Sequence, residues 1–107
     1  MATSITPPLP TAPLQRGVYN VFHKIVAEAT GATLGIARSR AKDRGERTFI
    51  NVKTAMDALR ASSPPGTTIR IGPIVIDSGK RVSQTTGLVA YVRAKYTIRF
   101  SVSYARR

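Results

Sequence analysis

Apolar and polar positions divide the chain into segments with different periods. Residues 14–30 carry apolar side chains at spacings mostly of three and four, which is typical of one face of a helix. These positions are Leu14, Val18, Val21, Phe22, Ile25 and Ala29. Because Gly31 follows, and glycine commonly ends helices, we predict a helix over residues 14–30.

A second, shorter segment has the same helical period. Its apolar stripe consists of Val52, Ala55, Met56 and Leu59. We predict a helix over residues 51–61, capped by Asn51 and stopped by the Ser-Ser-Pro-Pro-Gly segment at 62–66. Before it, we expect a short strand at residues 32–37. Residues 38–47 are polar without an apolar period, so we expect an exposed basic loop.

The second half of the chain shows the two-residue period of strands. Residues 67–76 are rich in β-branched side chains, and Pro73 predicts an edge position or a break, because proline cannot donate to a strand ladder. Residues 77–81 have turn chemistry. Residues 88–104 alternate cleanly, apolar on one face and basic or hydroxylic on the other. This predicts a half-buried antiparallel strand that is long enough to bend or to project beyond its domain.

Residues 1–13 contain four prolines and predict an extended N-terminal arm. Residues 14–107 are then a single α+β domain, in which two helices pack on an antiparallel sheet of about three or four strands. We expect the arm and the end of the long strand to contact neighbouring subunits. The residues predicted to make these contacts are Pro7, Pro8, Pro10 and Tyr104.

Length and composition fit one such domain. With 107 residues, 42% of them apolar, the chain can bury a modest core. It has no cysteine, which excludes disulfides, thiolate metal sites and thiol catalysis. It has no run of about 18 apolar residues, so we expect no membrane span. Its first residues lack the charged start and apolar run of a secretory signal.

The net charge is the feature of the composition that says most about possible partners. The chain has 17 Lys and Arg against 5 Asp and Glu, a net charge of +12 at pH 7. Such a charge on a small protein favours a polyanionic or acidic partner. Arginine outnumbers lysine 12 to 5, and guanidinium groups bind both phosphate and carboxylate in a bidentate manner. The candidate contacts are Arg38, Arg40, Lys42, Arg44 and Arg47 in the predicted loop, and Arg93, Lys95 and Arg99 on the long strand.

The strand cluster has a spacing that suits a nucleic-acid backbone. Residues two apart on a strand are separated by about 6.6 Å, not far from the step between phosphates. Tyr91 is the only aromatic residue predicted on this face, so the stacking platform of single-strand binders is weak. Any nucleic-acid contact would be electrostatic, salt-sensitive and poorly sequence-specific. The simpler alternative is a solvated sheet face whose charge maintains solubility.

The chain contains few residues of the types that catalyse reactions. His23 is the only imidazole, and it lies off the apolar stripe of the first predicted helix. A metal site needs several His, Cys or carboxylate ligands, whereas the five acids are scattered. The chain lacks a GxSxG elbow, a Walker-type loop and a GxGxxG motif. We therefore predict no enzymatic activity, no catalytic or metal-binding residues, no cofactor and no small-molecule substrate.

Three segments together resemble the small structural proteins of tailed phages. They are LQRGVYNVFHKIVAEA at 14–29, PPGTTIRIGPIVIDSG at 64–79 and GLVAYVRAKYTIRFSV at 87–102. The similarity is to the tail-terminator and tail-completion class or to a minor capsid subunit. It implies an α+β subunit in a ring or shell of the virion. The net charge and the Pro-rich start depart from that pattern, and a basic coat subunit facing packaged genome accounts better for both.

We therefore predict a virion structural or assembly protein that is assembled in the host cytoplasm. It would form homo-oligomers, contact other virion proteins, and direct its Arg-rich surfaces against packaged DNA or RNA or against acidic neighbouring subunits. The alternative is a free-standing nucleic-acid-binding protein of low sequence specificity.

Overall fold

A computed structural model describes residues 3–11, 14–77, 81–86 and 89–107, and for 81–86 and 89–91 it describes the backbone. Within these residues the protein has five strands and one helix. They are β1 (Thr3–Thr6), β2 (Gly17–Gly31), α1 (Leu34–Ala61), β3 (Thr68–Asp77), β4 (Arg81–Thr86) and β5 (Val89–Arg106). The fold is α+β, as predicted, with one helix in place of two.

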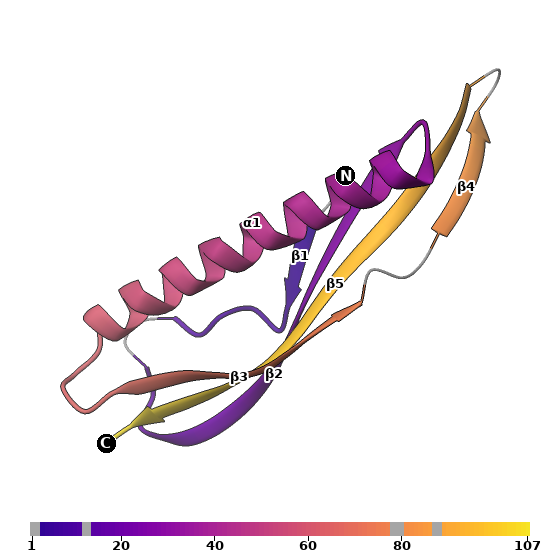
Figure 1. The fold of residues 1–107 in the computed structure, drawn as a ribbon. Helices are drawn as coiled ribbons and strands as arrows, with labels where there is room; N and C mark the ends of the chain where they lie inside the picture. The colour runs from indigo at the N-terminus through magenta and orange to yellow at the C-terminus, as the bar shows by residue number, and fades with distance from the viewer. Residues whose placement is uncertain (1–2, 12–13, 78–80, 87–88) are drawn as a thin grey trace.

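The strands form one antiparallel sheet in the order β1-β2-β5-β3, and β4 also pairs with β5 (Figure 1). β5 pairs with β2 along nearly its whole length, from Arg106 opposite Gly17 to Val92 opposite Gly31. On its other side it pairs first with β4 and then with β3. The prediction of a long C-terminal strand is confirmed. The first part of this strand, before the residues that pair with β3, pairs with β4.

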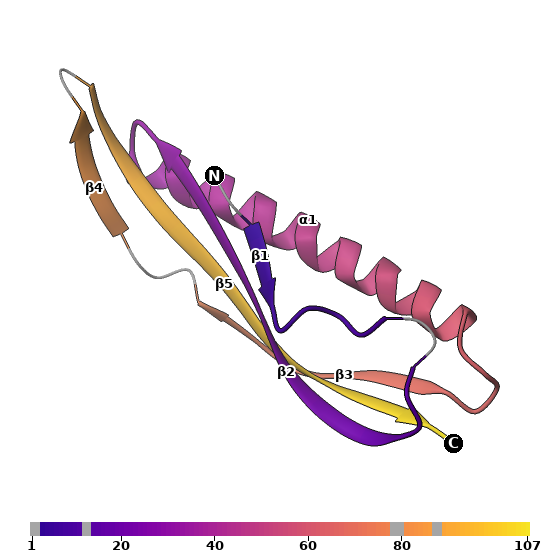
Figure 2. The same cartoon turned by 180° about the vertical axis from the view of Figure 1, so that it is seen from behind.

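The helix lies along one face of the sheet, and the other face is open (Figures 1 and 2). α1 packs mainly on β2 and β5. The alternation of β5 is confirmed, because every second residue from Ala94 to Tyr104 is buried on the helix side of the sheet. The helix contributes its own buried stripe to the same core. That stripe consists of Ala37, Ala41, Gly45, Val52, Met56 and Leu59.

The helix predicted over residues 14–30 is wrong, because residues 17–31 form β2. This segment also has a two-residue period, with alternate residues from His23 to Gly31 buried. In the strand these residues face α1, and each backbone position has a partner on β5, such as Ile25 opposite Ile98. The apolar stripe of a helix would have placed Phe22 in the core, whereas the strand turns it outward.

The predicted basic loop at 38–47 and the predicted strand at 32–37 are also wrong. Thr33 caps α1, since its hydroxyl accepts a hydrogen bond from the Ile36 N–H at 3.2 Å. The helix then continues without a break into residues 51–61, so Asn51 lies inside it. Small residues at every fourth position form the buried side of the first half, which explains why its sequence shows no period of large apolar residues.

Gly45 shows why these residues are small. A Cβ atom at this position would lie 2.5 Å from Cδ1 of the buried Tyr96 ring and 3.6 Å from Cβ of Ala27. The glycine therefore allows α1 to approach the sheet closely at its midpoint.

The strand predicted at 67–76 is confirmed as β3, which lies at the end of the strand order. Its register against β5 shifts between Ile71 and Ile74, around Pro73. The break and the edge position expected from this proline are both present. Of the turn predicted at 77–81, residues 78–80 lie outside the described residues.

The separate N-terminal arm is not confirmed. Residues 3–6 of it form β1 and pair with β2, from Thr3 opposite Ala27 to Thr6 opposite Lys24. Further along, Leu14 is buried, and its N–H lies 3.4 Å from the Ser63 hydroxyl. The described part of this segment therefore lies against the domain.

The molecule is elongated, with principal extents of 59 × 21 × 16 Å and a radius of gyration of 17.0 Å. A compact domain of this length would have a radius of gyration of about 13 Å. Across the described ranges, no helix has both the length and the apolar character needed to cross a membrane.

Candidate functional site

The open face of the sheet carries cations from three strands. Lys24 on β2, Arg70 on β3 and Arg99 on β5 are exposed there. We call these three residues the open-face cations. No carboxylate within the described residues forms an ion pair with any of them.

Two of the open-face cations are cross-strand partners. Lys24 lies opposite Arg99 in the register of β2 against β5. Like charges directly opposite each other destabilise a sheet, and a bound anion removes that repulsion. Thus the sheet places positive charge where an anionic partner would be favoured.

An aromatic ring stands next to this charge. Phe22 precedes Lys24 by two residues on the same face, and its side chain is 78% exposed. In the register it lies opposite Ser101, and the next cross-strand pair is Asn20 with Ser103. The face thus combines an exposed ring with hydroxyl groups and cations.

The open face is hollowed beside Phe22. A concavity of about 350 Å³ lies where β3 shifts its register, between Phe22 and Arg70, over the serines of β5. At this point β3 has Gly72, and a Cβ atom there would lie 2.3 Å from the Ser101 hydroxyl oxygen. The volume falls at the lower end of small-ligand pockets, which span roughly 300–1,000 Å³.

The structure divides the predicted strand cluster. Glu28 on β2 lies 3.4 Å from the Lys95 ammonium and 4.0 Å from the Arg93 guanidinium. Only Arg99 of the three predicted strand cations remains without a carboxylate partner among the described residues. The proposed row of phosphate contacts is therefore shorter than the sequence indicated.

The predicted loop cluster lies on α1 and is also divided. Arg40 donates to the Thr30 carbonyl at 3.0 Å, and Arg44 donates to the Glu28 carbonyl at 3.1 Å. Both acceptors lie on β2 beyond the four residues that pair with β1. These two arginines therefore supply hydrogen-bond donors to a stretch of β2 that β1 does not reach, which blunts an exposed strand edge.

The other cations of this cluster remain at the helix surface. Arg47 pairs with Asp43 at 3.0 Å, and Lys42 lies 4.0 Å from Glu46. Exposed pairs of this kind contribute little to stability. A pocket of about 310 Å³ is lined by Arg38, Ser39, Lys42, Lys95 and Tyr96. It gathers three predicted contact residues, from α1 and β5, and forms a second positive area.

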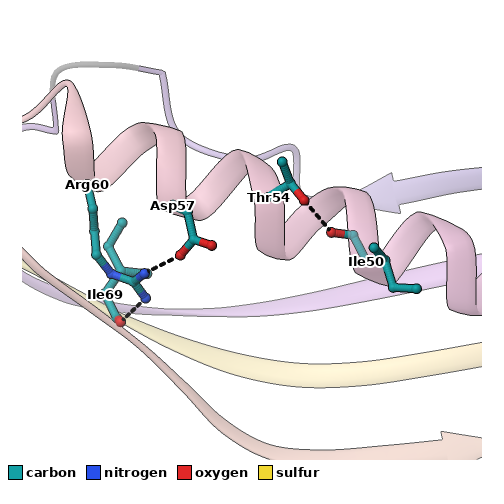
Figure 3. A network of polar contacts seen from close by, with 5 residues as sticks. All are labelled: Ile50, Thr54, Asp57, Arg60 and Ile69. Atoms are coloured by element: carbon teal, nitrogen blue, oxygen red, sulfur yellow. Dashed lines mark hydrogen bonds and ion pairs between the residues drawn. The ribbon is translucent and has the colours of Figure 1, made fainter.

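One further arginine fixes the end of the helix to the sheet (Figure 3). Arg60 pairs with Asp57 at 2.5 Å and donates to the Ile69 carbonyl on β3 at 2.7 Å. Earlier in the helix, the Thr54 hydroxyl donates to the Ile50 carbonyl at 3.1 Å. Arg60 therefore acts as a structural link and not as part of the open face.

The free edge of the sheet is apolar. Ile74, Val75 and Ile76 follow one another on β3, and all three side chains are about half exposed. Between this edge and α1 lies a groove of about 300 Å³, which Phe49 and Ile50 line from the helix. Tyr96 and Ile98 also line it, and Glu46 is the only carboxylate among its described lining residues. In the described residues, no strand pairs with the outer side of β3.

The predicted subunit contacts lie in different environments. Tyr104 is fully buried, and its hydroxyl lies 2.8 Å from Nε2 of His23, so its side chain is not available to a neighbour. The Pro7 carbonyl accepts from Nδ1 of His23 at 2.9 Å. Pro8 is exposed and Pro10 is half-buried.

His23 is a core residue with a structural role. It is 1% exposed, and in its neutral form Nδ1–H donates to Pro7, which leaves Nε2 to accept from Tyr104. The described residues contain no group of three or more side chains that could hold a metal ion.

Sequence reasoning missed three residues of the open face, namely Phe22, Lys24 and Arg70. Phe22 and Lys24 were placed on a helix, where they do not share a face with the C-terminal strand. The signal that could have found Phe22 and Lys24 is the second, two-residue period of residues 17–31. The side chain of Tyr91, the one aromatic residue predicted for this face, lies outside the described residues.

Comparisons of the chain with protein families, with curated protein sequences and with solved structures find no match.

Proposed function

We propose that this protein is a non-enzymatic structural subunit of a virus particle. It forms homo-oligomers through the free edge of its sheet and directs its open face toward nucleic acid or acidic neighbouring subunits. The observation that carries this proposal is the apolar edge of β3 on an elongated subunit.

The β3 edge supports self-association for a physical reason. Ile74 and Ile76 face the helix side, whereas Val75 faces the open side with Arg99. A partner that buries all three side chains must therefore contact both faces of the sheet along β3. A strand from a second copy achieves this by extending the sheet, because its own alternate residues lie on both faces.

The open-face cations support the contact with a polyanion or an acidic neighbour. They remain without carboxylate partners among the described residues, whereas the ion pairs of the subunit use other cations. The position in a virion rests on the resemblance to small phage structural proteins. Of the segments that carry this resemblance, 64–79 contains β3 and 87–102 contains most of β5, whereas 14–29 contains most of β2 and not the expected helix.

Light scattering after size-exclusion chromatography tests the self-association. The wild-type protein is expected to elute as an oligomer, and Ile76→Lys, which places a charge on the apolar edge, is expected to shift it toward the monomer. Ile36→Lys is the matched control, because Ile36 is an exposed isoleucine (42%, against 57% for Ile76) on α1, away from β3. A wild-type protein that stays monomeric at high concentration would contradict the proposal.

A free-standing nucleic-acid-binding protein is the second candidate, and the Lys24–Arg99 pair beside Phe22 favours it. It predicts that the monomer binds nucleic acid without assembling. Co-sedimentation with particles in an infected or producing cell separates the two candidates, because only a virion subunit would travel with the particle.

A further inference from the structure

Two chemical features meet on the open face, and different parts of a nucleic acid recognise them. An exposed aromatic ring stacks on bases, and cations bind phosphates. Phe22 supplies the ring, and Lys24 and Arg99 form the next cross-strand pair along β2 and β5. Successive pairs on one face are separated by about 6.6–6.8 Å along the strand. A base on the ring and the phosphates beside it would therefore be reached together.

We propose that the open face binds single-stranded nucleic acid, with one base stacked on Phe22 and the neighbouring phosphates bound by the open-face cations. This inference rests on the nucleic-acid contact of the proposed function and names the substrate class of that surface.

The hollow beside Phe22 fits this occupant. The residues that line it include Phe22, Ser101, Ser103 and Arg70. The hydroxyls can donate to or accept from a base edge or a sugar, and the guanidinium can bind a phosphate in a bidentate manner. Gly72 leaves room for the Ser101 hydroxyl, because a Cβ atom at this position would lie 2.3 Å from that oxygen.

The ring also selects against other polyanions. Bases of a duplex are stacked inside the helix, so a ring that projects from a sheet face cannot stack on them without opening the duplex. An acidic protein surface would use the cations but would gain little from the exposed ring. Single-stranded DNA or RNA uses the ring and the cations together.

The absence of tryptophan from the chain allows a direct test. Phe22→Trp introduces one fluorophore at the proposed stacking position. We expect its emission to be strongly quenched when a short oligothymidylate or oligouridylate is added. Val18→Trp is the matched control, because Val18 is on the same strand and face and is similarly exposed (76%). Its emission should change little.

Binding affinity provides a second readout, measured by anisotropy of a labelled oligothymidylate. Phe22→Ala should weaken binding about tenfold, Phe22→Tyr should preserve it, and Val18→Ala should leave it unchanged. Changing both Lys24 and Arg99 to Gln should reduce the slope of log affinity against log salt by about 1.4, because each phosphate contact on a single strand contributes about 0.7.

Three outcomes would overturn the inference. They are equal quenching of both tryptophan variants, an unchanged affinity for Phe22→Ala, or a duplex or polyglutamate that binds as tightly as the single strand. Light scattering on the same variants keeps the two proposals separate. Phe22→Ala should preserve the oligomer, so a monomeric protein in which the emission of the Phe22→Trp variant is still quenched would refute only the assembly role.

Discussion

The imidazole of His23 on β2 lies 2.8 Å from the hydroxyl of Tyr104 on β5, and both side chains are buried. The same ring reaches the Pro7 carbonyl on its other side. One histidine thus joins the N-terminal segment, the second strand and the last strand within the core.

Removing the Tyr104 hydroxyl tests this link. Tyr104→Phe leaves Nε2 of His23 buried without its partner, so we expect a loss of about 1–3 kcal/mol in the free energy of unfolding. Urea denaturation measures it. Tyr19→Phe is the control, because the Tyr19 hydroxyl has no hydrogen-bond partner in the described part of the chain, while its ring stacks on Tyr104 with centroids 5.3 Å apart. Equal losses in the two variants would show that the hydrogen bond is unimportant.

The same hydroxyl makes stability depend on alkaline pH. Burial, with a smaller effect of the neighbouring Tyr19, raises the pKa of Tyr104 from 10.0 to about 12. Because the unfolded chain ionises first, the stabilisation is fully present below about pH 10 and is lost as the pH rises toward 12. Thermal unfolding followed over this range should show a decline that is shallower in Tyr104→Phe. A parallel decline in both proteins would assign the effect to other groups.

Gly45 provides a test of the helix–sheet contact. In an exposed helix, replacing glycine by alanine gains about 1 kcal/mol. At this position the new methyl group would meet the Tyr96 ring at 2.5 Å, so we expect Gly45→Ala to lose about 1–2 kcal/mol instead. Gly35→Ala, with only the Thr33 hydroxyl within 4 Å at 3.9 Å, should be neutral or stabilising. The urea midpoints of both variants measure these changes in stability. A stabilised Gly45→Ala variant would contradict the close approach of α1 to the sheet at this position.

Arg40 and Arg44 give a prediction about strand edges. Changing both to Met preserves the apolar stems but removes the donors to Thr30 and Glu28, so we expect a loss of about 1 kcal/mol and more self-association. Arg47→Met, which removes only an exposed pair with Asp43, should change stability by less than about 0.5 kcal/mol. Denaturation and light scattering measure the two effects. Similar behaviour of the two variants would mean that the carbonyl contacts do not protect the edge.

β5 was predictable because its clean two-residue alternation fits only a strand. β3 was predictable because its β-branched composition also favours a strand. Residues 14–30 were not, since Val21, Ile25 and Ala29 fit both a period of 3.6 and a period of two. Pairing with β5 decides between them, and that pairing joins positions far apart in the chain. The first half of α1 was missed because Ala37, Ala41 and Gly45 form its buried side.

The residues of the candidate site were predictable to the same extent, that is, where a local pattern placed them. Arg99 was predictable from the alternation of its own strand. Phe22 and Lys24 join it only through the register of β2 against β5, which no local pattern contains. The ion pairs of Glu28 with Lys95 and Arg93 also cross between strands, so their neutralising effect could not be predicted from the sequence of β5 alone.

β5 has a consequence for how the molecule is made. It pairs with β2, β3 and β4, and its partners include Gly17, opposite Arg106. During synthesis β2, β3 and β4 emerge before β5, which pairs with all three. Their apolar side chains therefore stay exposed to solvent until β5 has been made. Contacts of such long sequence separation slow folding and lengthen the exposure of unpaired strands. A chain truncated before residue 89 would lack the strand that pairs with β2, β3 and β4, and we expect it to aggregate.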